Sequence, residues 1–191
     1  MNCRFGKSKT SEWQQLFLCI LIGLTLVLSS CGSAVGLRTY NDAEGLISFS
    51  YPNGMVAVES PSLAEAKVVL TDLVNNVETV SLMVSPYDQA ERIEEMGSPA
   101  EVGQRVKAHI LAPEGSNREA TLINAGQLQT NDTTYYLLEF NTSLAGIPRH
   151  ELVTVTIKHD QLYTLTASTS DSRWPQMKDT FYTVAQSLRV V

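Results

Sequence analysis

Two residues that could bind a metal ion together, His150 and Asp171, lie near the open end of one predicted β-hairpin. His159-Asp160 separates two strand-like segments and predicts a two-residue turn, because both residue types tolerate positive φ. This register pairs His150 with Thr169, so Asp171 becomes its diagonal neighbour, with Cα atoms about 7–8 Å apart. Imidazole and carboxylate groups are good ligands for zinc and manganese. The spacing therefore predicts a weak, two-ligand metal site at the surface.

Structural interpretations of these and similar residues stand beside the metal interpretation. His150 and its partner can form a simple hydrogen-bonded contact, or Asp171 can cap the last helix. Glu91 and Glu95 would share a helix face and could hold calcium weakly, and the alternative is a solvated acidic surface. The other two histidines are expected in a turn and on the flank of a helix, without a ligand role.

The amino-terminal segment predicts export and lipidation at Cys31. Three basic residues precede an uncharged apolar run at 16–28, and the chain then reads Leu28-Ser29-Ser30-Cys31, which resembles the bacterial lipobox. The run is shorter than the roughly 20 residues that a membrane span requires. We therefore expect a signal peptide at 1–30, a lipid-anchored tether at 31–37 and a domain at 38–191. The alternatives are a retained transmembrane anchor and an ordinary signal followed by a free cysteine.

The mature chain would contain 161 residues, which suits one domain with its own core. Loss of residues 1–30 removes three basic residues and one acidic residue, leaving 11 basic and 19 acidic residues, a net charge of −8. An acidic domain is a poor candidate for binding nucleic acid or anionic lipid. Membrane contact would come from the acyl chains alone. We expect the protein to be a monomer. It should contain no disulfide, because Cys31 would be the last cysteine left.

Catalytic motifs are absent from the sequence. It contains no Gly-x-Ser-x-Gly elbow, no His-Glu-x-x-His pair and no glycine-rich loop that could hold a phosphate. Acylation of Cys31 would also remove the only remaining thiol nucleophile. We therefore predict that the protein is not an enzyme and requires no cofactor.

Short segments rich in β-branched and aromatic residues alternate with turn signals across the mature chain. Asn75-Asn76, Asn131-Asp132 and His159-Asp160 fall where tight hairpin turns are expected. Because such connections are too short for crossovers, neighbouring strands should be antiparallel. We expect strands at 46–51, 67–74, 78–84, 120–129, 133–142, 149–158 and 161–169.

Two helices are expected between and after these strands. Ser98, Pro99 and Glu101 form a capping box with proline at the first helical position, and Pro113 ends that helix. The second helix begins near Pro175, and its spacing predicts a buried stripe. The order of strands, helix, strands and helix predicts an α+β domain with a mainly antiparallel sheet. The expected stripe contains Met177, Phe181, Val184 and Leu188.

Several segments, taken in their order and spacing, carry a resemblance to a known family. They are Gly36 to Tyr40, Gly45 to Gly54, Asn131 to Tyr136, His150 to Lys158, Leu162-Tyr163, and Asp171 to Trp174. Together they resemble the PsbP family, the extrinsic lumenal proteins of photosystem II. The lipobox is similar to that of the cyanobacterial branch, whose members are lipoproteins of the thylakoid lumen.

The resemblance implies an α/β/α sandwich with a central, mainly antiparallel sheet. It also implies a non-enzymatic partner of lumenal photosystem II subunits that helps assembly or supports the oxygen-evolving side, on the lumenal face of the thylakoid membrane. His150 and Asp171 match positions proposed as a metal site in plant members, so zinc, manganese or calcium could bind there. This chain lacks the long lysine-bearing arm and the basic surface of plant members. These differences favour a transient or assembly role over retention of calcium and chloride.

Two other function classes remain open at this point. One is a generic extracytoplasmic ligand-binding or adhesion lipoprotein that shares the fold, since fold alone does not determine function. The other is a metal-dependent enzyme, which the sparse ligand set disfavours.

Overall fold

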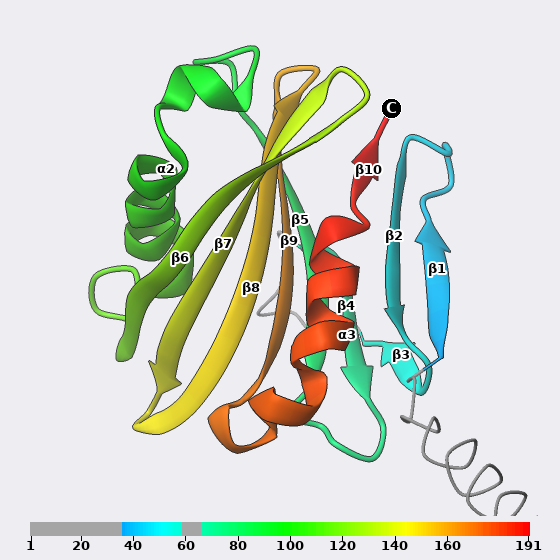
Figure 1. Cartoon of the computed structure of the whole chain (residues 1–191), viewed down its shortest axis with the longest axis vertical. Helices are drawn as coiled ribbons and strands as arrows, with labels where there is room; N and C mark the ends of the chain where they lie inside the picture. The colour runs from blue at the N-terminus through cyan, green and yellow to red at the C-terminus, as the bar shows by residue number, and fades with distance from the viewer. Residues whose placement is uncertain (1–35, 59–65) are drawn as a thin grey trace, which may run out of the picture. The chain divides into compact units, whose positions relative to one another are not determined.

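The computed structural model describes residues 36–58 and 66–191, which belong to one compact unit. Cys31 and the predicted signal peptide lie outside these residues. A seven-stranded sheet, ordered β3-β4-β5-β9-β8-β7-β6 and antiparallel throughout, dominates the described part (Figure 1). Its strands are β3 (Met55–Ala57), β4 (Ala66–Asp72), β5 (Thr79–Pro86), β6 (Arg118–Thr130), β7 (Thr133–Leu144), β8 (Ile147–Lys158) and β9 (Gln161–Ser170).

Left-handed turn residues set the register of the long hairpins. Asn131, His159 and Asp160 all have positive φ, as the turn chemistry predicts. The β8–β9 hairpin pairs Lys158 with Gln161 and His150 with Thr169. The predicted β8–β9 register is therefore confirmed. The tight turn expected at Asn75-Asn76 is wrong, because residues 73–78 form a longer loop between β4 and β5.

A second sheet of three strands lies beside the first one. It contains β1 (Leu37–Asn41), β2 (Ile47–Pro52) and β10 (Arg189–Val190), and β2 pairs with both others. Strand β2 matches the strand expected at 46–51, whereas β10 was not predicted. Two residues are too short for a pattern, and this strand forms because β2 offers a free edge where the chain leaves the last helix.

Helix α2 (Pro99–Val106) covers one face of the large sheet. The predicted capping box is present, with the Ser98 side chain accepting from the Glu101 backbone N–H and the Glu101 carboxylate accepting from Ser98. The helix is shorter than expected, because it continues as a π-helical segment, η3 (Lys107–Leu111). A short 3₁₀ turn, η2 (Ile93–Met96), precedes it.

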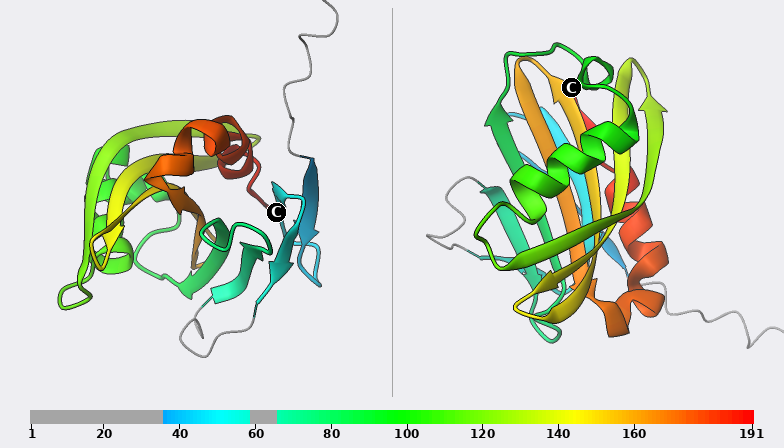
Figure 2. Two further views of the ribbon diagram at one scale, coloured as in Figure 1. Left: turned by 90° about the horizontal axis from the view of Figure 1, so that it is seen from below. Right: turned by 90° about the vertical axis from the view of Figure 1, so that its left-hand side faces the viewer.

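Helix α3 (Trp174–Gln186) covers the opposite face, after the 3₁₀ turn η4 (Asp171–Arg173) (Figures 1 and 2). Met177, Phe181 and Val184 are buried on this helix, as the spacing predicts. Leu188 is also buried, but it lies beyond the end of the helix at Gln186, so its assignment to the helical stripe is wrong. With helices on both faces of a largely antiparallel sheet, the structure confirms the predicted α+β class and the layered α/β/α arrangement.

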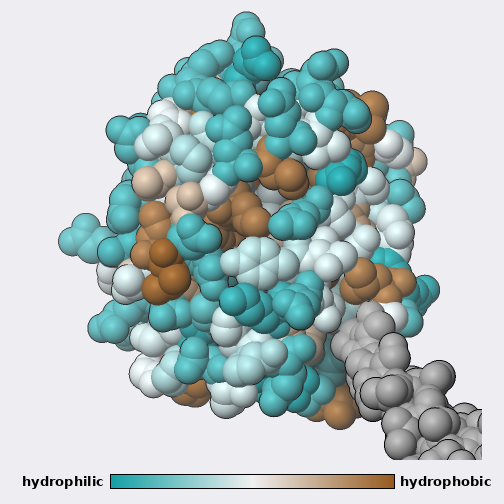
Figure 3. All heavy atoms as spheres, viewed as in Figure 1, coloured by the Kyte–Doolittle hydropathy of each residue, from teal (hydrophilic) through white to brown (hydrophobic). Residues whose placement is uncertain are grey.

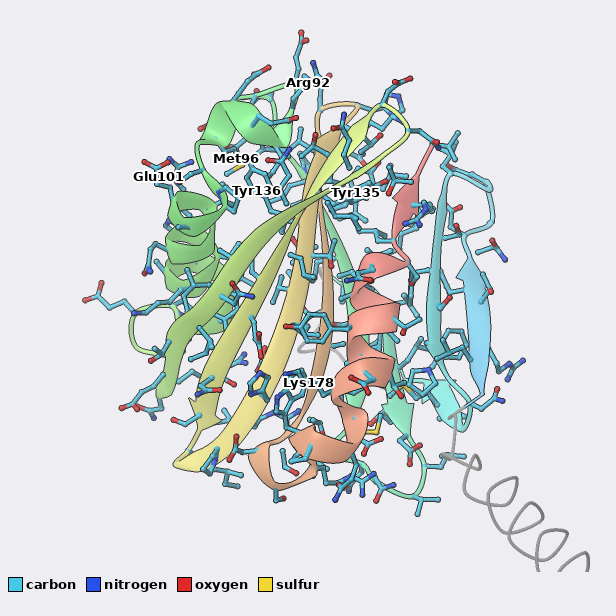
Figure 4. All side chains as sticks on the ribbon, in the orientation of Figure 1. Arg92, Met96, Glu101, Tyr135, Tyr136 and Lys178 are labelled. Atoms are coloured by element: carbon cyan, nitrogen blue, oxygen red, sulfur yellow. The ribbon has the colours of Figure 1, made fainter. Side chains whose placement is uncertain are left out.

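Adjacent tyrosines show how one strand contributes to two separate cores. On β7, the Tyr135 hydroxyl accepts from the Val190 backbone N–H, while the Tyr136 hydroxyl donates to the Gly97 carbonyl (Figure 4). Tyr135 belongs to the core under α3, and Tyr136 to the core under α2. The alternation follows from the two-residue period of a strand.

The surface shown in Figure 3 is mostly hydrophilic, and its apolar groups form separate small patches. Among residues 36–58 and 66–191, no helix is both long and apolar enough to cross a membrane.

Candidate functional site

His150 is buried on the α3 face of the sheet, where it meets a carboxylate and an indole. Its Nε2 lies 2.7 Å from Oε1 of Glu139 on the neighbouring strand β7. Its ring stacks on Trp174, with centroids 3.7 Å apart and planes at 13°. The imidazole is therefore held on one edge by a carboxylate and on one face by an aromatic ring.

The second oxygen of Glu139 is also occupied. Tyr182 on α3 donates its hydroxyl to Oε2 at 2.7 Å, and burial, then the hydrogen bond to Glu139, raises the pKa of Tyr182 to about 12. Lys178 Nζ lies 6.0 Å from the Tyr182 ring centroid, at the limit for a cation–π contact. We call Glu139, His150, Trp174 and Tyr182 the His150 cluster.

Asp171 does not join this cluster. Strand β9 ends at Ser170, and Asp171 is the exposed first residue of η4. The diagonal geometry that the sequence suggests applies only while both residues stay in strands. Within the described residues no group of three or more histidine, cysteine, aspartate or glutamate side chains is placed to hold a metal. A cation at His150 would find Nε2 already engaged by Glu139, so the metal site stays a prediction.

Glu139 is the functional candidate that sequence reasoning missed, although the signal was present. His150 pairs with Asn141 across β7, and Glu139 is two residues from Asn141, which makes it a diagonal neighbour on the same face. Finding it requires the turn at Ala145-Gly146, where both residues have positive φ. Without that turn the β7–β8 register was not available.

The remaining sequence candidates have local roles. His159 forms the β8–β9 turn, and His109 is exposed on η3. In the acidic segment, Glu95 accepts from the Glu91 backbone N–H at 3.1 Å, so that pair closes the η2 turn. Arg173 donates to the buried carboxylate of Glu78, which ties η4 to the β4–β5 hairpin.

A cavity of about 1230 Å³ lies on the opposite, α2 face of the sheet. Strands β5, β8 and β9 form its floor, and α2 with η3 forms its roof. Figure 2 (right) shows α2 lying across the strands of this face. The floor contains hydroxyl groups such as those of Ser81 and Thr166, and the roof contains Val106 and Ile110. The sequence did not predict this cavity.

Comparison with known proteins supplies the family. The PsbP family model matches residues 35–190. The chain belongs to the PsbP family. Among PsbP relatives, CyanoP of Thermosynechococcus vestitus is 34% identical over 182 residues, covering 93% of this chain and 98% of the relative. CyanoP of Synechocystis is 30% identical over 171 residues, covering 87% of this chain and 91% of the relative.

A solved PsbP structure agrees with the fold. The solution structure of cyanobacterial PsbP (CyanoP) from Synechocystis superposes with a TM-score of 0.69 at 31% identity, covering 85% of this chain and 98% of that one. The resemblance seen in the sequence is thereby confirmed, and so is the fold that it implied.

Proposed function

We propose that this protein is a non-enzymatic accessory or assembly protein of photosystem II. It acts on the lumenal side of the thylakoid membrane, held there by a lipid on Cys31. The observation that carries the proposal is the match to the PsbP family over residues 35–190, with cyanobacterial relatives aligned over nearly their whole length. The partners are lumenal subunits or assembly intermediates of photosystem II.

The chemistry of the His150 cluster supports a structural role over catalysis. Both oxygens of Glu139 are engaged, and the ring of His150 is covered by Trp174. A general base needs a lone pair facing a substrate, and in this cluster the groups face one another. The cluster joins β7 and β8 to α3 and therefore stabilises the packing of this helix on the sheet.

Isolation of the tagged protein from its native membrane tests the docking proposal. At low salt we expect photosystem II subunits or assembly intermediates to co-purify, and their yield to fall as salt rises, because an acidic domain should bind a basic surface. Deletion of the gene should slow photosystem II accumulation more than it changes oxygen evolution per assembled centre. Recovery of no photosystem II component at low salt contradicts the proposal.

Lipidation at Cys31 has its own test. Mass spectrometry of the native protein should find an acylated Cys31 at the amino terminus, since two or more acyl chains anchor a protein stably. Cys31→Ser should release the domain from membranes, whereas the control Cys19→Ser, within the expected signal, should leave fractionation unchanged. Retention of the Cys31→Ser protein in salt-washed membranes contradicts the lipid anchor.

Weak binding of zinc, manganese or calcium at His150 and Asp171 is part of the same proposal. The partly exposed edge at η4 and the imidazole–carboxylate chemistry support it. Such a site would modulate the docking surface, with no metal required for folding.

A second candidate function is an extracytoplasmic ligand-binding lipoprotein that shares this fold. The cavity on the α2 face is the observation that favours it, because ligand sites are concave, partly apolar and few per protein. Co-purification with photosystem II would separate the two functions.

A further inference from the structure

The cavity on the α2 face exists because packing between the sheet and the elements above it is uneven. Helix α2 packs closely on β6 and β7 through Val102 and Val106. Farther across the sheet, β5 and β9 present Ser81 and Thr166, which are directly paired and short. Short side chains cannot reach the roof, so a space remains between them and η3.

The roof is itself unusual, because η3 is π-helical over Lys107–Leu111. A π-helical turn is less stable than an α-helical turn and is found frequently at functional sites. Here it lies over the cavity and contributes His109, Ile110 and Leu111 to the lining.

One end of the cavity carries two guanidinium groups for one buried carboxylate. Arg118 Nη2 lies 3.4 Å from Glu151 Oε1, which also accepts the Thr142 hydroxyl at 2.9 Å. Arg149 donates through Nε and Nη2 to Ser168 Oγ, at 3.1 and 2.7 Å, and through Nη2 to the Val77 carbonyl at 2.9 Å, which leaves its Nη1 for a ligand. Glu151 is 3% exposed, so water solvates its carboxylate little.

Arg118 has an unused donor at this end. Its Nε is buried and has no hydrogen-bond partner, and its contact with Glu151 is long. A buried donor without a partner is costly and rare. With Arg105 in the roof, the charged lining comprises three arginines and two glutamates, in a mature chain of net charge −8. The cavity is therefore locally positive in an acidic protein.

We propose that this cavity binds a small organic acid. Its carboxylate pairs with Arg118 and Arg149, because guanidinium groups bind carboxylates through two parallel hydrogen bonds. Its apolar body lies under Val106 and Ile110, and the floor hydroxyls accommodate polar substituents. This inference goes beyond docking to photosystem II and does not depend on it.

Titration calorimetry with three ten-carbon probes tests the proposal on the full chain. Decanoate should bind with one-to-one stoichiometry, and at least about tenfold more tightly than decanol, because the anion gains charge-assisted hydrogen bonds. Decylamine should not bind in the cavity. Equal affinity for decanoate and decanol overturns the proposal.

Two variants and one control locate the binding. Arg118→Gln should weaken decanoate about tenfold and leave decanol unchanged. Thr166→Leu narrows the space above the floor and should weaken both, whereas Thr121→Leu, exposed on β6 and outside the cavity, should change neither. Thermal melting verifies that each variant is folded. An affinity for decanoate that is unchanged in both cavity variants overturns the proposal.

An acetylated tetraglutamate peptide provides the competing occupant. If it displaces decanoate at equal or lower concentration, the cavity is a peptide site and the small-acid proposal is wrong. Failure of the peptide to compete, together with the two variant effects, supports the proposal.

Discussion

The two faces of the seven-stranded sheet are packed differently, although the same strands contribute side chains to both. Under α3, Phe181 and Val184 are fully buried, and the Thr154 hydroxyl donates to the Ala185 carbonyl at 2.6 Å. Under α2, buried apolar side chains pack over β6, β7 and β8, and a cavity remains over β5 and β9. The α3 face is built for stability, and the α2 face leaves room for another molecule.

Successive residues of β9 illustrate the difference. Leu165 and Ala167 pack in the core under α3, whereas Thr164 and Thr166 line the cavity. The same division holds on β5, where Leu82 is in the core and Ser81 is in the cavity. The serine and threonine side chains on the α2 side are short, so they leave space above them.

The largest expected effect on stability is on the α3 face. Phe181→Ala should lower the free energy of unfolding by about 3–5 kcal/mol, because it creates a cavity in a core that cannot collapse around it. Denaturant unfolding measures the change. Val74→Ala is the matched control, since Val74 is 88% exposed and should change stability by less than about 0.5 kcal/mol. A variant that melts like the parent contradicts the assignment of Phe181 to the core.

The next largest effect on stability is expected at the His150 cluster, at the edge of the α3 face. His150→Ala should cost about 1–3 kcal/mol, because Glu139 loses a partner and Trp174 loses its stacked ring. Asp171→Ala should have little effect on stability, since Asp171 is exposed.

The same two variants test metal binding. If zinc binds at His150 and Asp171, each variant should weaken zinc affinity and Asp171→Ala should do so without loss of stability. Unchanged zinc affinity in both variants would remove the metal hypothesis.

A matched pair of threonine-to-valine substitutions compares the faces directly. Thr154→Val should cost about 1–2 kcal/mol, because it leaves the Ala185 carbonyl without its donor. Thr166→Val should be nearly neutral, since its hydroxyl faces the cavity. Equal losses in denaturant unfolding would show that the two faces are packed alike.

The smallest expected effect is a pH dependence of stability that arises from Tyr182 on the α3 face. Burial and Glu139 raise the pKa of Tyr182 to about 12, above its ordinary value near 10. The unfolded chain therefore loses this proton first, so the stability that Tyr182 contributes is complete below pH 10 and declines as pH approaches 12. Tyr182→Phe should flatten the stability profile over that interval. An unchanged slope between pH 10 and 12 contradicts the shifted pKa.

Much of the fold was predictable from local signals. Turn residues with positive φ set the β8–β9 register, and the capping box at Ser98 located the start of α2. The apolar spacing of α3 predicted its buried residues, because a helix that packs on a sheet needs one continuous apolar stripe. These features depend on residues close together in the chain.

The candidate site was only half predictable. His150 was found, but its partner Glu139 depends on the turn between β7 and β8. Asp171 lies just after the end of β9 at Ser170, and its pairing with His150 around a metal stays a prediction. The sequence also failed to predict strand β10 and the π-helical segment after α2, since neither has a sequence pattern of its own.

By itself, the sequence determined the α+β class, the hairpin order, the PsbP resemblance and the separate placement of alternate residues on two faces. Tertiary structure alone decided which groups meet across those faces: Glu139 with His150, and Arg118 with Glu151. It also decided that α2 crosses the sheet without filling the space above β5 and β9. The physical reason is that periodicity gives the side on which a residue lies, whereas contact and empty space depend on how distant elements pack.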